Sequence, residues 1–128
     1  MTETTIRVSL WLACPFNLMA ALVFAFPSST IGQQLGLPDH VHPLYSLLVA
    51  LFVGLFGFVY AWLARRRAID QPLLALGSVG KLGAFLIAGF LYLTGVVPGV
   101  VAFVALGDLA FAALWLSWLL SGRGQRAA

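Results

Sequence analysis

The chain has 128 residues, of which 62% are hydrophobic and 9% charged, and its formal net charge is +3. Soluble domains carry about one quarter charged residues, so this composition excludes an ordinary soluble protein and predicts an integral membrane protein. A single cysteine excludes an intrachain disulfide and a cysteine-rich metal site. The small charge excess lies beside apolar segments, which indicates membrane topology and no nucleic-acid partner.

The first apolar segment spans residues 8–26 and follows a short polar lead. A signal peptide is the competing interpretation, because Arg7 precedes the apolar run and small residues lie near its end. The run is longer than the roughly 7–15 apolar residues of a signal peptide, and Glu3 offsets the charge of Arg7. We therefore interpret this segment as an uncleaved transmembrane helix.

The longest connection, residues 27–43, contains several prolines and glycines but no lysine or arginine, which predicts a loop. Within it, Asp39, His40 and His42 are weak candidates for metal ligands. Alternating residues in a loop do not define a tetrahedral site, and the expected fourth ligand is absent from the local sequence. We therefore expect no metal and no cofactor.

Three further apolar segments follow, at residues 44–64, 73–96 and 98–120. Asp70 and Pro72 predict the start of the third, with the aspartate as N-cap and the proline in the first turn. Each segment is long enough to cross a hydrocarbon core of roughly 30 Å as a helix. The sequence predicts an all-α membrane protein, with residues 1–128 forming one domain of four transmembrane helices in an antiparallel up-down bundle.

The arginines predict how this bundle is oriented. Those at positions 7, 65–67, 123 and 126 fall on one side of a four-span chain, and the loop on the other side has none. Under the positive-inside rule, both termini are then cytoplasmic.

In size and span count the chain resembles small four-span bacterial inner-membrane proteins, which include small drug-proton antiporters. This resemblance implies a multi-pass protein of a bacterial-type inner membrane. Those antiporters place an essential glutamate in the first span, where this chain has no acidic residue. Neither their site residues nor their mechanism are therefore transferred to it.

The last two spans each carry one charged residue near the middle, Lys81 and Asp108. A charge inside a bilayer costs roughly 2.5–3.5 kcal/mol on insertion scales, which makes both residues candidates for a functional site. If the chain turns near Val96, their Cα atoms differ in depth by roughly 4–5 Å. A lysine side chain can span this difference, so we expect an intramembrane ion pair.

Small residues recur on one stripe of each span and predict its inward face, because helices in lipid pack through small side chains. Lys81 and Asp108 lie on these stripes, and Asn17 is the one strongly polar residue in the middle of the first span. We predict that these three form a ligand- or proton-binding cluster near the midplane. The candidates for surrounding groups are Ser78, Tyr60 and Trp115. A structural clamp that fixes helix order is the alternative, and both roles stay open.

Three classes of function are compatible with such a cluster. The first is binding or transport of an apolar or amphiphilic small molecule. The second is an accessory or structural subunit of a larger membrane complex. The third is a membrane enzyme that acts on a lipid-soluble substrate, which a tight ion pair disfavours because it holds both groups in their charged forms. The sequence contains no nucleophile–base motif, so no catalytic residue is predicted and we favour the first class.

We also expect partners beyond the lipid bilayer itself. Gly80, Gly83 and Gly89 lie off the stripe of Lys81 and leave a close-packing surface for another helix. This favours a homo-oligomer or a place in a larger membrane complex.

Overall fold

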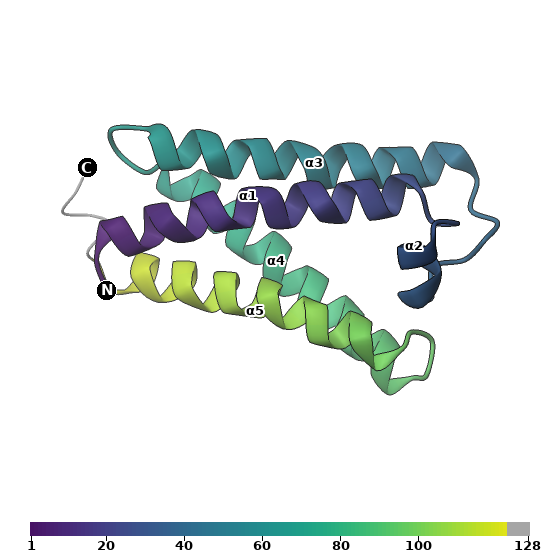
Figure 1. Cartoon of the computed structure of the whole chain (residues 1–128). Coiled ribbons are helices and arrows are strands. Elements are labelled where there is room, and N and C mark those ends of the chain that lie inside the picture. Colours follow the sequence, from purple (N-terminus) through teal and green to yellow (C-terminus); the bar gives the residue numbers. More distant parts are fainter. Residues whose placement is uncertain (123–128) are drawn as a thin grey trace.

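The computed structural model describes residues 1–122 and folds them into helices and connecting loops (Figure 1). The four long helices are α1 (Glu3–Ala25), α3 (Pro43–Arg65), α4 (Gln71–Leu93) and α5 (Gly99–Leu120), and a short helix, α2 (Thr30–Gln34), follows α1. The described part of the chain contains no β-strand. Arg123 and Arg126, which contributed to the predicted orientation, lie outside the described residues.

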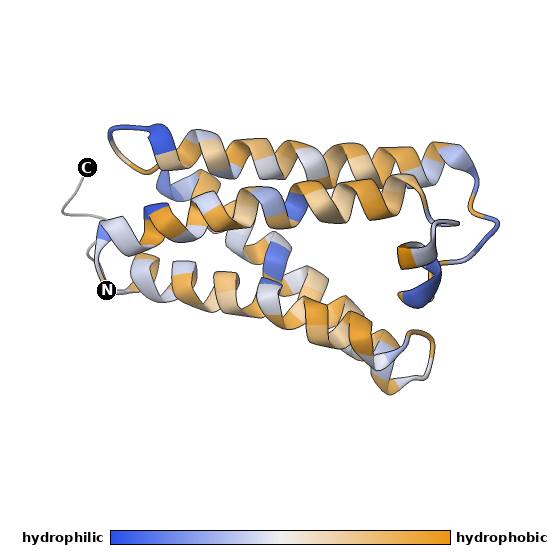
Figure 2. Ribbon diagram, viewed as in Figure 1, coloured by the Kyte–Doolittle hydropathy of each residue, from blue (hydrophilic) through white to orange (hydrophobic). Residues whose placement is uncertain are grey.

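Each of the four long helices is long and apolar enough to span a membrane. Figure 2 shows hydrophobic residues along all four, interrupted by a hydrophilic turn near the middle of α1 and another near the middle of α4. Hydrophilic residues are otherwise concentrated in the loops and at the helix ends. These features indicate a small multi-pass membrane protein, as the sequence predicted.

Two helix boundaries differ by three or more residues from those expected. Helix α1 begins at Glu3 instead of residue 8, because the Thr2 side chain caps it by accepting a hydrogen bond from the Thr5 amide. Glu3 forms an ion pair with Arg7 one turn later, so the polar lead is helical. Helix α4 ends at Leu93 instead of residue 96, and Gly95 follows it with a φ of 77°, a conformation that glycine adopts readily.

The loop between α1 and α3 is more ordered than the sequence suggested. It contains α2, whose first turn is capped by Ser29 Oγ accepting from the Gly32 amide at 3.1 Å. The predicted N-cap of α4 is confirmed, since Asp70 Oδ1 accepts from the Leu73 amide at 3.0 Å. Local capping chemistry therefore defines several of the helix starts.

The long helices are arranged as two pairs. Helix α1 packs along α3, and α4 packs along α5, whereas α1 and α5 meet over a short region. Figure 1 shows the two pairs close together near the N-terminus and diverging toward α2. The chain thus forms two successive hairpins that are joined at one end.

A buried apolar cluster holds the two pairs together at the end near the N-terminus. Its members include Ile6, Leu63, Leu74 and Trp115, one from each long helix. The indole Nε1 of Trp115 donates to Ser9 Oγ at 2.8 Å, which joins α5 to α1 through a buried hydrogen bond. This end of the molecule is therefore tightly packed.

Arg7 forms hydrogen bonds to backbone carbonyls at the same end of the molecule. Its guanidinium donates to the carbonyl oxygens of Ala64 at 2.8 Å, Arg66 at 2.6 Å and Arg67 at 2.9 Å. The last carbonyls of a helix have no partner within the helix, so Arg7 satisfies groups at the end of α3 and in the loop that follows. Arg7 thus has a structural role in addition to its predicted effect on topology.

Glycine allows α1 and α3 to approach closely. A Cβ atom on Gly57 would lie 3.1 Å from the carbonyl oxygen of Cys14 and 3.2 Å from Cβ of Asn17. Both contacts are tighter than ordinary van der Waals contact, and the first involves backbone that cannot rotate away. This contact also fixes the position of Asn17 against α3.

Substituting Gly57→Ala should destabilise the protein by about 1–3 kcal/mol, the usual result of overpacking a close contact. Gly54→Ala, on the same helix, is the matched control, because a Cβ atom there would lie 3.5 Å from Cβ of Ala21, an ordinary van der Waals contact, and alanine is the better helix former. Thermal unfolding of both variants in one mild detergent measures the difference. Equal melting temperatures would contradict the close approach of α1 to α3.

Candidate functional site

Lys81 and Asp108 face each other from the middle of α4 and α5. The ammonium Nζ lies 2.6 Å from the carboxylate Oδ1, within the range of a charge-assisted hydrogen bond. The Lys81 side chain is 4% exposed and that of Asp108 is 18% exposed. The structure therefore brings together the two charged residues that the sequence singled out, and shields the lysine more completely than the aspartate.

Asn17 completes the predicted trio. Lys81 Nζ donates to Asn17 Oδ1 at 2.9 Å, and Asn17 Nδ2 in turn donates to the Val53 carbonyl oxygen at 3.0 Å. One continuous chain of hydrogen bonds thus runs from α3 through α1 and α4 to α5. It contains a contribution from each of the four long helices.

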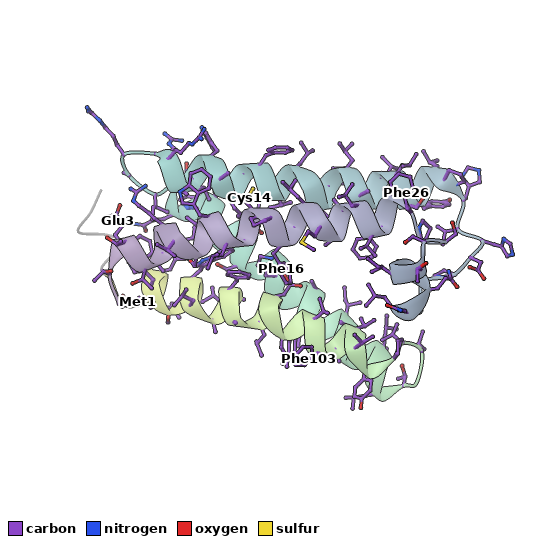
Figure 3. The ribbon with its side chains drawn as sticks, viewed as in Figure 1. Met1, Glu3, Cys14, Phe16, Phe26 and Phe103 are labelled. Carbon is purple, nitrogen blue, oxygen red and sulfur yellow. The ribbon has the colours of Figure 1, made fainter. Side chains whose placement is uncertain are left out.

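Three aromatic rings surround the lysine ammonium. Nζ lies 5.0 Å from the ring centroid of Phe16, 5.1 Å from that of Phe111 and 5.4 Å from that of Tyr60. Phe16, labelled in Figure 3, lies between α1 and α5. A cation within about 6 Å of an aromatic face is stabilised by the ring quadrupole, and more strongly where water is excluded. The rings, Asn17 and Asp108 together compensate the burial of this charge.

A cavity of about 680 Å³ lies between the two helix pairs, and all five helices or their adjoining loops contribute to its lining. Its polar lining comes from Asn17, Tyr60, Lys81 and Asp108. The rest of the lining is apolar and includes Ala20, Val23, Ile31, Phe52, Ala84 and Val104. The cavity therefore combines one polar, charge-balanced region with extended hydrophobic walls. A smaller pocket of about 160 Å³, between the end of α1 and the start of α3, has no charged lining residue.

The residues expected around the trio have different positions. Tyr60 lies beside Lys81 and lines the cavity. Trp115 lies behind it, with its ring centroid 5.0 Å from that of Tyr60, and also packs on Phe111. Ser78 is fully buried, and its hydroxyl donates to the Leu74 carbonyl within α4 instead of to a member of the trio. Tyr60 thus belongs to the site, and Trp115 supports it.

The weak metal-ligand candidates do not form a site in the structure. His42 caps α3, with its Nδ1 accepting a hydrogen bond from the Leu44 amide at 3.2 Å, and its ring packs against Tyr45. Among residues 1–122, no group of three histidine, cysteine or acidic side chains is placed to hold a metal ion. Asp39 and His40 lie in the loop before this cap.

Sequence reasoning missed three contributors to the site, namely Phe16, Phe111 and the Val53 carbonyl. Phe111 follows Asp108 by three residues, a spacing that places two helical residues on one face and could have indicated it. Phe16 lies 2.9 Å from where a Cβ of Gly107 would be, so glycine on α5 makes room for its ring. No sequence pattern indicates which backbone carbonyl Asn17 would reach.

Comparison of the chain with models of known families, with curated proteins and with solved structures finds no match. The function of the site is therefore inferred from its geometry.

Lys81→Met and Asp108→Asn should each destabilise the protein by about 3–5 kcal/mol, because each strands its former partner as an uncompensated buried charge. The double substitution should recover much of this loss, and the yield of folded protein measures it. Asp70→Asn is the matched control, since asparagine also caps helices and the exposed ion pair of Asp70 with Arg66 contributes little to stability. A double variant no more stable than the worse single variant would contradict the coupling.

Proposed function

We propose that this chain is a multi-pass protein of a bacterial-type inner membrane that binds, and through that binding can transport, an apolar or amphiphilic small molecule. The observation that carries this proposal is the cavity between the two helix pairs, which ends on Asp108, Lys81, Asn17 and Tyr60. A cluster that served only as a clamp would need no such space beside it.

The size and the lining of the cavity support a small-molecule site. Ligand pockets commonly have volumes of roughly 300–1,000 Å³, with mostly apolar walls and a few polar groups that fix orientation. This cavity has about 680 Å³ and the same division of its lining. An amphiphile would place its polar end at the charged pair and its apolar part along the walls.

Access from the lipid side is also supported. Met19, Phe52 and Val104 line the cavity and are nevertheless 69%, 59% and 46% exposed. These side chains lie on the outer surface of helices that we propose to be embedded in lipid. A hydrophobic molecule could therefore enter between α1/α3 and α4/α5 without crossing water.

The proposed orientation places both termini in the cytoplasm. Arg7 contacts the backbone of the loop that carries Arg66 and Arg67, so these arginines gather at one end of the described structure. The loop at the opposite end, residues 27–43, contains no lysine or arginine. This asymmetry is the pattern that orients bacterial membrane proteins.

Native mass spectrometry of the protein released from nanodiscs should detect a bound lipid or hydrophobic metabolite. Ala84→Phe, which adds a ring at the wall of the cavity, should lower the occupancy severalfold. Ala110→Phe is the matched control, because Ala110 lies on exposed helix surface outside the cavity lining.

Protein that carries no bound molecule in this experiment would contradict the proposal. Equal occupancy of the bound molecule in Ala84→Phe and Ala110→Phe would show that it binds outside the cavity. The measured mass also counts protomers, and we propose that the chain associates with a second copy or with a larger membrane complex.

Alkaline phosphatase, which is active only outside the cytoplasm, should be inactive when fused after Ala128 and active when fused after His40. The reason is that the arginine-bearing end of the helices is retained in the cytoplasm. Enzyme activity in cells that produce each fusion measures the orientation. An active fusion after Ala128 would reverse the proposed topology.

A further inference from the structure

The charges of the site restrict the chemistry of its ligand. We infer that the cavity takes an uncharged amphiphile with a hydroxyl head group, such as a long-chain alcohol, in preference to the corresponding acid or amine. This inference rests on the proposed binding function and narrows it to one ligand class. It is carried by two oxygen atoms, in side chains that line the cavity, that have no hydrogen-bond partner within residues 1–122.

The first of these groups is the Tyr60 hydroxyl. Tyr60 is 2% exposed and lines the cavity, and its hydroxyl makes no hydrogen bond with any of the described residues 1–122. No side-chain nitrogen or oxygen that is both fully buried and unpaired occurs in this part of the chain. The small surface that Tyr60 retains therefore includes its hydroxyl, and in this proposal that surface faces the cavity that Tyr60 lines.

The second group is the outer oxygen of Asp108. Oδ1 accepts from Lys81 at 2.6 Å, whereas Oδ2 has no hydrogen-bond partner among the described residues. Asp108 and Tyr60 flank the same ammonium and both residues line the cavity, so the proposed ligand hydroxyl lies between their free oxygens. Together they present one donor and one acceptor. A ligand hydroxyl can satisfy both, because it donates one hydrogen bond and accepts others.

An acidic head group does not fit this arrangement. Among the described residues, Lys81 is the one cation that lines the cavity. It is already paired with Asp108, bonded to Asn17 and surrounded by aromatic rings. It is 4% exposed and leaves little surface for a second anion. A ligand carboxylate would instead meet the free oxygen of Asp108, a repulsive contact between like charges.

An amine head group is disfavoured for the complementary reason. It would share Asp108 with Lys81, which places two cations beside one carboxylate in a largely apolar cavity. A net charge would remain buried, and an uncompensated charge is costly to remove from water. An uncharged hydroxyl leaves the existing pair intact.

The test uses the full chain in liposomes and three photoreactive probes with one alkyl chain, namely palmityl alcohol, palmitic acid and palmityl amine. Cross-linked residues are identified by mass spectrometry. On the wild-type protein, the alcohol should label cavity residues roughly tenfold more than either charged probe, given the size of like-charge penalties. Tyr60→Phe should lower labelling by the alcohol roughly three- to tenfold, the effect of one lost hydrogen bond.

Tyr92→Phe is the matched control. It removes the same hydroxyl from α4, where Tyr92 packs against Gly99 outside the cavity lining, and should leave labelling unchanged. The comparison of the three probes needs no variant, so it stands even if Tyr60→Phe reduces the amount of folded protein.

Preferred labelling by the amine or the acid would overturn the inferred ligand class and leave the proposed function in place. Equal labelling by all three probes, or labelling by the alcohol that Tyr60→Phe does not lower, would overturn it as well. Labelling of no cavity residue by any probe would contradict the proposed binding function itself.

Discussion

The burial of one lysine ammonium is the constraint on which the rest of this structure depends. A charge removed from water needs an opposite charge, hydrogen-bond acceptors or both. Lys81 obtains a carboxylate from α5 and an amide oxygen from α1, and that amide is held by a carbonyl of α3. Because no single neighbour supplies all of these groups, the four long helices must come together at one level for the lysine to be buried.

The two helix pairs are packed differently on the two sides of the buried lysine. Toward the N-terminus, the pairs are joined by the buried apolar cluster, by the bond from Trp115 to Ser9 and by the contacts of Arg7 with the end of α3. Beyond the lysine the pairs diverge and the cavity lies between them. The polar chain therefore marks the boundary between a packed half and an open half. The same residues that stabilise the assembly also form the polar end of the cavity.

Much of this arrangement could be predicted from the sequence. Counting residues from the turn near Val96 was enough to predict that Lys81 and Asp108 could meet, since helical rise converts sequence separation into depth. Capping chemistry likewise predicted Asp70 as the start of α4, because an aspartate followed two residues later by a proline suits the start of a helix.

Other features could not be predicted because they depend on packing between distant segments. Stripes of small residues predicted an inward face for each helix but not the angle between the two pairs. A cavity beside the polar trio was expected, but not that the divergence of the two pairs would form it. Phe16 was missed because the space for its ring is provided by Gly107, ninety-one positions away in the sequence. The helical start of α1 at Glu3 was missed because the polar residues there were interpreted as a lead outside the helix, although Thr2 and Arg7 stabilise a helix.

The order of the two hairpins along the chain has a consequence for biosynthesis. Asn17 and Val53 are already present when Lys81 leaves the ribosome, but Asp108 follows only 27 residues later. At roughly 5–20 residues per second, this delay is about 1–5 s. During that interval the lysine has a hydrogen-bond acceptor but no counter-charge. Burial of Lys81 before its aspartate has been made would leave an uncompensated charge, which favours a nascent hairpin that keeps the lysine in contact with water.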